Sequence, residues 1–249
     1  MYHFFVDSSA IGEGKVRITG ADLNHMKNVL RMKPGEAVLI SDGTGKDYNC
    51  QVETYTEGEG ILEILSENED SRELPSRIWL FQGLPKSDKM EFIIQKAVEL
   101  GAAGIVPVST RNTVVKLDPK KEEAKVKRWQ AIAESAAKQS KRSLVPRVSG
   151  IMTLKEAFDY VESQGFSVRL IPYEHEAGMD GTKTELDAAG PGQDIAVFIG
   201  PEGGFDEREI ELALSKGVRP ISLGRRILRT ETAGLALLSV LMMRLEGAL

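Results

Sequence analysis

From residue 77 onward, short apolar segments alternate with longer amphipathic segments, and this alternation is what most constrains the fold. The short segments have the length of strands, and residues 195–199 are apolar throughout. The longer segments place apolar residues at helical spacing and end near glycine or proline. Strands that alternate with helices in this way predict an α/β fold, with a mostly parallel sheet and helices on both faces. The expected strands are residues 78–83, 105–108, 167–172, 195–199 and 220–223, and the expected helices are residues 87–100, 119–141, 153–163, 206–215 and 230–245.

Residues 2–66 have a different pattern, because short β segments joined by turns surround one helical segment at residues 21–31. This pattern predicts a small all-β or barrel-like unit. Residues 66–75 are acidic and polar and are expected to form a linker. We therefore expect two domains, residues 1–70 and residues 75–249. In the second domain, residues 175–192 are expected to form a turn-rich insertion, and the helix at residues 230–245 is apolar enough to be buried in the core or in a subunit interface.

The composition excludes several classes of protein. Hydrophobic residues make up 41% of the chain, which excludes a disordered protein. Cys50 is the single cysteine, which excludes an intramolecular disulfide framework, and His3, His25 and His175 have no metal-ligand spacing, so no metal is expected. The N-terminal residues do not have the pattern of a signal peptide, and the longest apolar run, residues 233–243, is too short to cross a bilayer. These features predict a cytoplasmic protein that does not bind membranes.

The net charge of −5 conceals an uneven distribution along the chain. Residues 1–70 carry a net charge of −7, residues 71–150 carry +8 and residues 151–249 carry −6. A local basic surface can bind phosphate whatever the total charge, because electrostatic fields are screened within about 10 Å. The basic middle of the chain therefore indicates either an RNA-binding surface or the solvated face of a long helix.

Three strand ends carry unusual residues, at 170–174, 198–205 and 223–232. Ligands of open α/β sheets bind at the carboxyl ends of strands, so these segments are candidates for a binding site. The glycines of the second segment do not have dinucleotide-binding or P-loop spacing. They either form a simple turn before a helix capped by Asp206 and Glu209, or they offer backbone N–H groups to a ligand. The arginines of the third segment are either solvated, with Thr230 as a helix cap, or held rigidly to recognise phosphate or carboxylate.

Residues 200–205 (GPEGGF) and 223–233 (LGRRILRTETA) resemble the two C-terminal motifs of the ribosomal RNA small subunit methyltransferase E family, in the SPOUT superfamily. The similarity continues through residues 89–101, 128–146 and 29–35, so it covers nearly the whole chain. The resemblance implies a PUA-like RNA-binding domain followed by a SPOUT-type domain with a deep C-terminal trefoil knot. It also implies a homodimer that uses S-adenosylmethionine to methylate N3 of a uridine in the decoding region of 16S rRNA, with the small ribosomal subunit as its partner.

The resemblance also assigns residues to the cofactor and to the reaction. The cofactor-binding residues would be Leu170, Ile171, Ile199, Gly200, Gly203, Leu223, Gly224, Ile227 and Leu228. The alternative for the leucines and isoleucines is ordinary core packing. Arg229 is the candidate for stabilising negative charge on the uracil ring, and Glu202 and Glu231 are candidates for the general base. Both glutamates have a competing structural role, because one lies in the glycine turn and the other in the first turn of a helix.

The expected RNA contacts lie mainly in the basic middle of the chain. They are Arg31, Lys89, Arg111, Lys127, Arg128, Lys138, Lys141 and Arg142. Because N3 of uracil lies on the pairing edge, the target base must be unpaired or flipped out. Three alternatives stay open: a SPOUT methyltransferase acting on tRNA or another rRNA base, a non-enzymatic ribosome-assembly factor, and a nucleotide-dependent oxidoreductase, which the missing glycine spacing disfavours.

Overall fold

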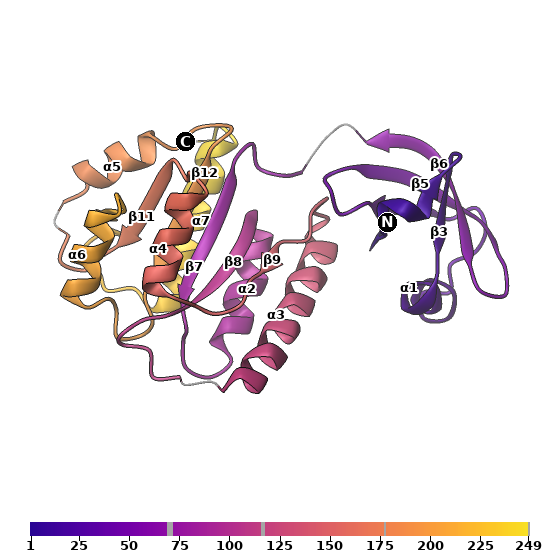
Figure 1. Ribbon diagram of the computed structural model, residues 1–249. Coiled ribbons are helices and arrows are strands. Elements are labelled where there is room, and N and C mark those ends of the chain that lie inside the picture. Colours follow the sequence, from indigo (N-terminus) through magenta and orange to yellow (C-terminus); the bar gives the residue numbers. More distant parts are fainter. Residues whose placement is uncertain (69–71, 116–117, 177, 249) are drawn as a thin grey trace. The chain divides into compact units, whose positions relative to one another are not determined.

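The computed structural model describes residues 1–68, 72–115, 118–176 and 178–248, which form two compact units (Figure 1). The N-terminal unit comprises Met1–Glu73 and Ala137–Val145, and the C-terminal unit comprises Leu74–Ala136 and Pro146–Leu249. The segment Ala137–Val145 was not expected in the N-terminal unit. The predicted linker at residues 66–75 also differs, because strand β6 continues to Asn68, while residues 69–71 lie outside the described residues.

The N-terminal unit is built on a curled six-stranded sheet (Figure 1). Its strands are β1 (Tyr2–Phe5), β2 (Ile11–Gly12), β3 (Lys15–Ile18), β4 (Ala37–Ser41), β5 (Asp47–Tyr55) and β6 (Gly60–Asn68). Their order is β1-β4-β5-β6-β3-β2, in which β1 and β4 are parallel and the other pairs are antiparallel. The predicted all-β unit is therefore confirmed, and it forms a curled sheet.

One short helical segment closes the core of this sheet. Helix α1 (Gly20–Asn24) continues as a π-helical turn over His25–Val29, so the helix ends before the expected Arg31. Arg31 has a φ of 55°, a left-handed conformation that cannot continue a helix. Met26 is completely buried and packs with apolar side chains of the sheet such as Val38 and Leu62.

A buried polar network fixes the second segment of the N-terminal unit. Arg142 is only 4% exposed, and its guanidinium donates from Nε and Nη2 to the carboxylate of Glu73. The same carboxylate accepts the backbone N–H of Ser143 at 3.0 Å, and the Ser143 hydroxyl donates to Asp47 at 2.8 Å. Since each polar group is paired, the network holds Ala137–Val145 without leaving a charge alone in the interior.

The first strand is part of the same network. The Ser41 hydroxyl donates to Asp47, and the His3 ring Nε2 lies 2.6 Å from the Ser41 oxygen. Burial lowers the pKa of the His3 imidazole, because desolvation outweighs the opposing effects of the Lys138 carbonyl and the Asp47 carboxylate. The network therefore joins β1, β4 and β5 to the segment around Arg142.

The C-terminal unit contains a fully parallel seven-stranded sheet, as the alternating pattern predicts. Its main path is β10-β8-β7-β12-β11-β13, and β9 pairs with β8 beside β10. The strands are β7 (Arg77–Gly83), β8 (Ala102–Ser109), β9 (Arg147–Val148), β10 (Met152–Thr153), β11 (Val168–Pro172), β12 (Asp194–Ile199) and β13 (Arg219–Ile221).

Helices cover both faces of this sheet (Figure 1). They are α2 (Lys89–Glu99), α3 (Pro119–Ser140), α4 (Leu154–Ser163), α5 (Asp180–Asp187), α6 (Glu207–Ser215) and α7 (Thr230–Leu245). Phe81 and Phe198 pack with residues of α4 and α6, whereas their strand neighbours Leu80 and Ile199 lie against Gly234 of α7. This alternation along the strands places α4 and α6 on one face and α7, which packs on α2, on the other.

Two features of this unit bear on the sequence predictions. Helix α5 occupies part of residues 175–192, so the expected turn-rich insertion contains regular structure; Ala177 lies outside the described residues. Strand β12 lies between β7 and β11, and β13 pairs with the far side of β11 before α7 returns to β7 and β12. This order returns the last helix to the middle of the sheet, and the trefoil knot stays a prediction.

We predict that Arg142→Ala destabilises the protein by about 3–5 kcal/mol, because the Glu73 carboxylate is then buried without its charge partner. Urea unfolding followed by circular dichroism measures the loss. The exposed Lys46→Ala in the same unit is the control and should change stability by less than about 0.5 kcal/mol. The double variant Arg142→Met, Glu73→Gln should recover part of the loss, and equal stability of Arg142→Ala and wild type would contradict the assignment.

Candidate functional site

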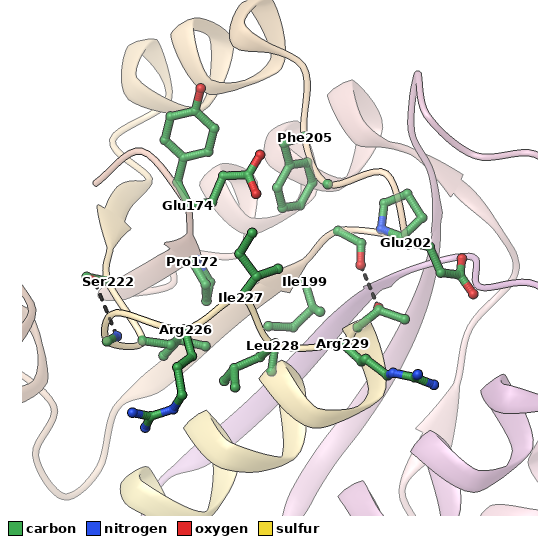
Figure 2. Close-up of a pocket in the computed structure, with 18 of the residues that line it drawn as sticks. Pro172, Glu174, Ile199, Glu202, Phe205, Ser222, Arg226, Ile227, Leu228 and Arg229 are labelled. Carbon is green, nitrogen blue, oxygen red and sulfur yellow. Dashed lines mark hydrogen bonds between the residues drawn. The ribbon is translucent and has the colours of Figure 1, made fainter. Parts of the chain in front are cut away.

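A pocket of about 430 Å³ opens at the carboxyl ends of β11, β12 and β13, where the three unusual strand ends meet (Figure 2). This position is the one expected for a ligand of an open α/β sheet, and the volume suits a small organic molecule. Pro172 and Glu174 lie on one side of the pocket, and Ile227 and Leu228 lie across from them. The full lining is Lys89, Pro172, Tyr173, Glu174, Ile199, Gly200, Pro201, Glu202, Gly204, Phe205, residues 222–230 and Ala233.

The loop at residues 222–229 forms one wall, and hydrogen bonds between side-chain hydroxyls and the backbone fix its start. The Thr182 hydroxyl of α5 donates to the Ser222 carbonyl at 3.1 Å and accepts the Ser222 N–H at 2.8 Å. The Ser222 hydroxyl then accepts the N–H of Gly224, whose φ of 97° favours glycine. Helix α5 was missing from the sequence prediction, yet it anchors this wall.

The glycine turn at residues 200–205 forms the opposite wall. Gly204 has a φ of 63°, and the Asn112 side-chain amide donates to the carbonyls of Gly203 and Gly204 at 2.8 and 3.3 Å. Asp206 and Glu209 form a capping box at the start of α6, as the sequence predicts. Glu209 also accepts the Arg111 N–H at 2.8 Å. The turn is therefore held in place both by the helix that follows it and by the loop after β8.

A hydroxyl group joins the two walls beneath the pocket. Thr230 is 6% exposed, and its Oγ1 donates to the Gly200 carbonyl at 2.6 Å while accepting Nε2 of the fully buried Gln82 at 2.8 Å. Arg229, not Thr230, occupies the cap position of α7, so the expected capping role of Thr230 is wrong. Its hydroxyl instead connects β7, β12 and α7.

Cationic side chains surround the mouth of the pocket. Arg225, Arg226 and Arg229 are exposed, and within the described part of the chain their side chains make no hydrogen bond or ion pair. Arg226 and Arg229 extend in different directions from the loop, with Ile227 between them (Figure 2). Ile227 is 85% exposed, which is unusual for an isoleucine. The rigid loop therefore presents unpaired arginines and an apolar side chain to solvent.

Beside Arg229, Lys89 lies between two carboxylates. Its Nζ is 3.1 Å from Glu202 Oε1 and 3.2 Å from Glu231 Oε2. Glu202 also accepts the backbone N–H of Lys86 at 3.1 Å. The hydrogen bond to Glu202 and then the ion pair with Glu231 raise the pKa of the Lys89 ammonium.

The two glutamates respond in the opposite direction. Partial burial raises the pKa of the Glu202 carboxyl, but its hydrogen bonds to the backbone and to Lys89 outweigh this effect, so the net pKa is lowered. A backbone hydrogen bond and Lys89 lower the pKa of Glu231. All three groups are therefore held in their charged forms.

The structure brings most of the predicted cofactor residues together. Ile199, Gly200, Leu223, Gly224, Ile227 and Leu228 line the pocket, as do Arg229 and Glu202. Leu170 and Ile171 lie in β11 and are fully buried, and the lining begins at the next residue, Pro172. Gly203 and Glu231 lie beside the pocket rather than in its lining. Their assigned roles stay predictions.

The predicted RNA-binding residues are divided between the two units. Arg31, Lys138, Lys141 and Arg142 belong to the N-terminal unit, and Lys89, Arg111, Lys127 and Arg128 belong to the C-terminal unit. Arg128 pairs with Glu91 at 2.8 Å, and Arg111 lies 3.6 Å from Asp206. Arg142 is buried against Glu73, which places its side chain away from solvent. No local pattern indicates this burial, because Glu73 is 69 residues away along the chain.

Sequence reasoning missed several lining residues. Tyr173 and Glu174 follow β11, Phe205 follows the glycine turn, and Lys89 begins α2. The segments that contain the first three had been singled out, whereas nothing near Lys89 in the sequence indicates that it reaches the pocket. Among the described residues, no group of three or more His, Cys, Asp or Glu side chains could hold a metal ion. No described helix combines the length and apolar character needed to cross a membrane.

Comparison with known proteins places this architecture in a family. Residues 72–242 match the RNA methyltransferase domain family, and residues 18–65 match the RNA methyltransferase PUA domain family. Ribosomal RNA small subunit methyltransferase E from Bacillus subtilis is 35% identical over 92% of this chain and 90% of its own length.

Two solved structures are similar over nearly the whole chain. Ribosomal RNA small subunit methyltransferase E from Neisseria gonorrhoeae, bound to S-adenosylmethionine, is 34% identical, has a TM-score of 0.84 and covers 98% of both chains. A methyltransferase from Legionella pneumophila in complex with the same cofactor is 31% identical, has a TM-score of 0.81 and covers 97% of both chains. The chain belongs to the ribosomal RNA small subunit methyltransferase E family, as its motifs predict.

Proposed function

We propose that this member of the family transfers a methyl group from S-adenosylmethionine to N3 of a uridine in the decoding region of 16S rRNA, with the 30S particle as substrate. The observation that carries the proposal is the pocket at the ends of β11, β12 and β13, bounded by both family motifs. The cytoplasm, where ribosomes are assembled, is the proposed place of action.

The pocket residues suit S-adenosylmethionine. Ile199, Leu223 and Leu228 offer apolar surface to a flat adenine ring, and the peptide groups of the surrounding loops offer donors and acceptors to its edge. Glu174 supplies a negatively charged carboxylate, which can attract a cationic ligand. Both relatives described above bind this cofactor, which supports the same assignment here.

When bound, the cofactor supplies an activated methyl group on a sulfonium centre. The residues of this chain then have to align the uridine N3 with that methyl group, and good alignment is worth roughly 7–11 kcal/mol. The N3 proton has to leave to solvent or to a base, and its loss leaves negative charge on the uracil oxygens. Arg229 is proposed to stabilise this charge, because it lines the pocket, is exposed and makes no ion pair with the described residues.

The roles proposed for the two glutamates follow from their charge environment. A general base works best when its pKa lies near the working pH, whereas the pKa values of Glu202 and Glu231 are both lowered. Both carboxylates also share Lys89. The geometry therefore favours the structural alternative for Glu202 and Glu231 over the general-base hypothesis.

RNA binding is proposed to use both domains, with residues 1–70 as the PUA-like RNA-binding domain and residues 75–249 as the SPOUT methyltransferase domain. Arg31, Lys127 and Lys141 are the best placed of the predicted contacts, because they are exposed and make no ion pair with described residues. Exposed cations of this kind bind phosphate and make affinity fall steeply with salt. The target base must be unpaired or flipped out to reach the pocket.

A homodimer is proposed through the face formed by α2 and α7. These two helices pack on each other, and they leave Phe92, Val240 and Met243 between 38% and 47% exposed. Leu238 lies in the same apolar helix, but it is fully buried and belongs to the core rather than to the exposed face. Exposed apolar side chains on a helix pair of this kind are typical of subunit interfaces.

A methyl-transfer assay with labelled S-adenosylmethionine tests the function. Unmodified small-subunit particles, naked 16S rRNA and tRNA are offered in parallel, and mass spectrometry identifies the product nucleoside. The proposal expects 3-methyluridine from the small-subunit particle. A different methylated nucleoside, or methylated tRNA, would show that the proposed substrate is wrong. Absence of both methyl transfer and cofactor binding would favour a non-enzymatic assembly factor.

Arg229→Ala should lower the rate of methyl transfer about 100- to 1,000-fold, because the developing charge loses its cation. The affinity for S-adenosylmethionine, measured by calorimetry, should stay nearly unchanged. Arg219→Ala, an exposed arginine in β13, is the control and should keep full activity. An equal loss of affinity and rate in Arg229→Ala would show that Arg229 binds the cofactor.

Met243→Glu should convert the dimer to a folded monomer, because a carboxylate on the apolar face of α7 cannot be buried in an interface without a partner. Sedimentation velocity measures the mass, and circular dichroism verifies folding. Leu214→Glu, at an equally exposed leucine of α6, is the control and should not alter the mass. A dimer of unchanged stability from Met243→Glu would contradict the proposed face.

A further inference from the structure

We propose that Lys89 is a positioning residue of the methyl-transfer site, which bridges Glu202 and Glu231 and compensates part of their negative charge beside Arg229. The proposal rests on the function proposed above and identifies how this chain keeps the mouth of its pocket cationic. It differs from the RNA-phosphate contact that the sequence suggests for Lys89.

The contacts of Lys89 join the two walls of the pocket. Glu202 belongs to the glycine turn after β12, and Glu231 lies in the first turn of α7. Because Nζ lies within 3.2 Å of both carboxylates, one ammonium group links the turn to the helix that follows Arg229. This link lies at the rim, whereas the Thr230 hydroxyl joins the same elements beneath the pocket.

The position of Lys89 is unfavourable unless the glutamates compensate for it. Lys89 is the first residue of α2, and the helix dipole disfavours a cation at a helix N-terminus. Glu202 is close enough to accept the Lys86 N–H just before that helix. The lysine is therefore stabilised by its two partners, which fixes its ammonium group and leaves it less free to follow an RNA phosphate.

The electrostatic consequence concerns Arg229. Two carboxylates next to a site where uracil gains negative charge would repel that charge, because Coulomb interactions are strong at short range. The charge of Arg229 contributes to lowering the pKa of its near neighbour Glu231, so these two groups interact. With Lys89 in place, part of the anionic charge is compensated and Arg229 stays available to the substrate. Without it, the carboxylates would oppose the reaction and compete for Arg229.

The test is a charge-rebalancing series in the full-length protein: Lys89→Met, Glu202→Gln/Glu231→Gln, and the triple variant Lys89→Met/Glu202→Gln/Glu231→Gln. We expect Lys89→Met to lower kcat by about 10-fold or more, with little change in KM for RNA. The triple variant should recover most of that loss, since it removes the carboxylates that Lys89 compensates. Lys89→Arg, which keeps the charge, should retain more activity than Lys89→Met.

Two other outcomes would overturn the proposal. If Lys89 contacts RNA directly, the triple variant stays as impaired as Lys89→Met, and KM and the salt dependence of binding change instead of kcat. Full activity of Lys89→Met would also refute it. Thermal unfolding and cofactor affinity of each variant separate a folding defect from a catalytic one. If the wild-type product is not 3-methyluridine, the proposed substrate fails independently of how this series behaves.

Discussion

The hydroxyl of Thr230 is the contact on which the pocket depends. It connects a glutamine inside β7, a carbonyl at the end of β12 and the first turn of α7, three elements that are distant in sequence. Because a threonine side chain is short and the donor of Gln82 is fully buried, the start of α7 has little freedom to move. Arg229 immediately precedes this contact, so its backbone position is set by the core of the sheet.

Above this contact, the positive and negative side chains of the pocket have different surroundings. Its arginines are left without partners among the described residues, whereas Glu202 and Glu231 share a lysine. A site that binds a polyanion and then places negative charge on a base needs this arrangement, with cations available and anions compensated. The pKa shifts of Lys89, Glu202 and Glu231 agree with this arrangement, since each group is held in its charged form.

Local pattern predicted the sheet, its helices and the three segments that meet at the pocket, because strand ends of a parallel sheet must lie on one edge. It did not show which atoms of those segments face the ligand. The family resemblance assigned Leu170 and Ile171 to the cofactor, whereas the lining of the pocket begins at Pro172. Local pattern also did not show the partners of Lys89. Glu202 is 113 residues away, and Glu231 lies farther along the chain. Such long-range ion pairs leave no periodic signal in the sequence.

The limits of the N-terminal unit were hard to predict for the same reason, since its polar contacts join segments that are distant in sequence. A fragment ending at residue 70 would lose Glu73, Arg142 and Ser143, so Asp47 would keep the hydrogen bond from Ser41 but lose the one from Ser143. Asp47 is only 2% exposed, so the carboxylate oxygen that pairs with Ser143 would be left without that partner in a buried site. The sheet therefore depends on residues 137–145, which lie at and after the end of α3 in the sequence. The N-terminal unit is compact in space, but it is not one continuous segment of the chain.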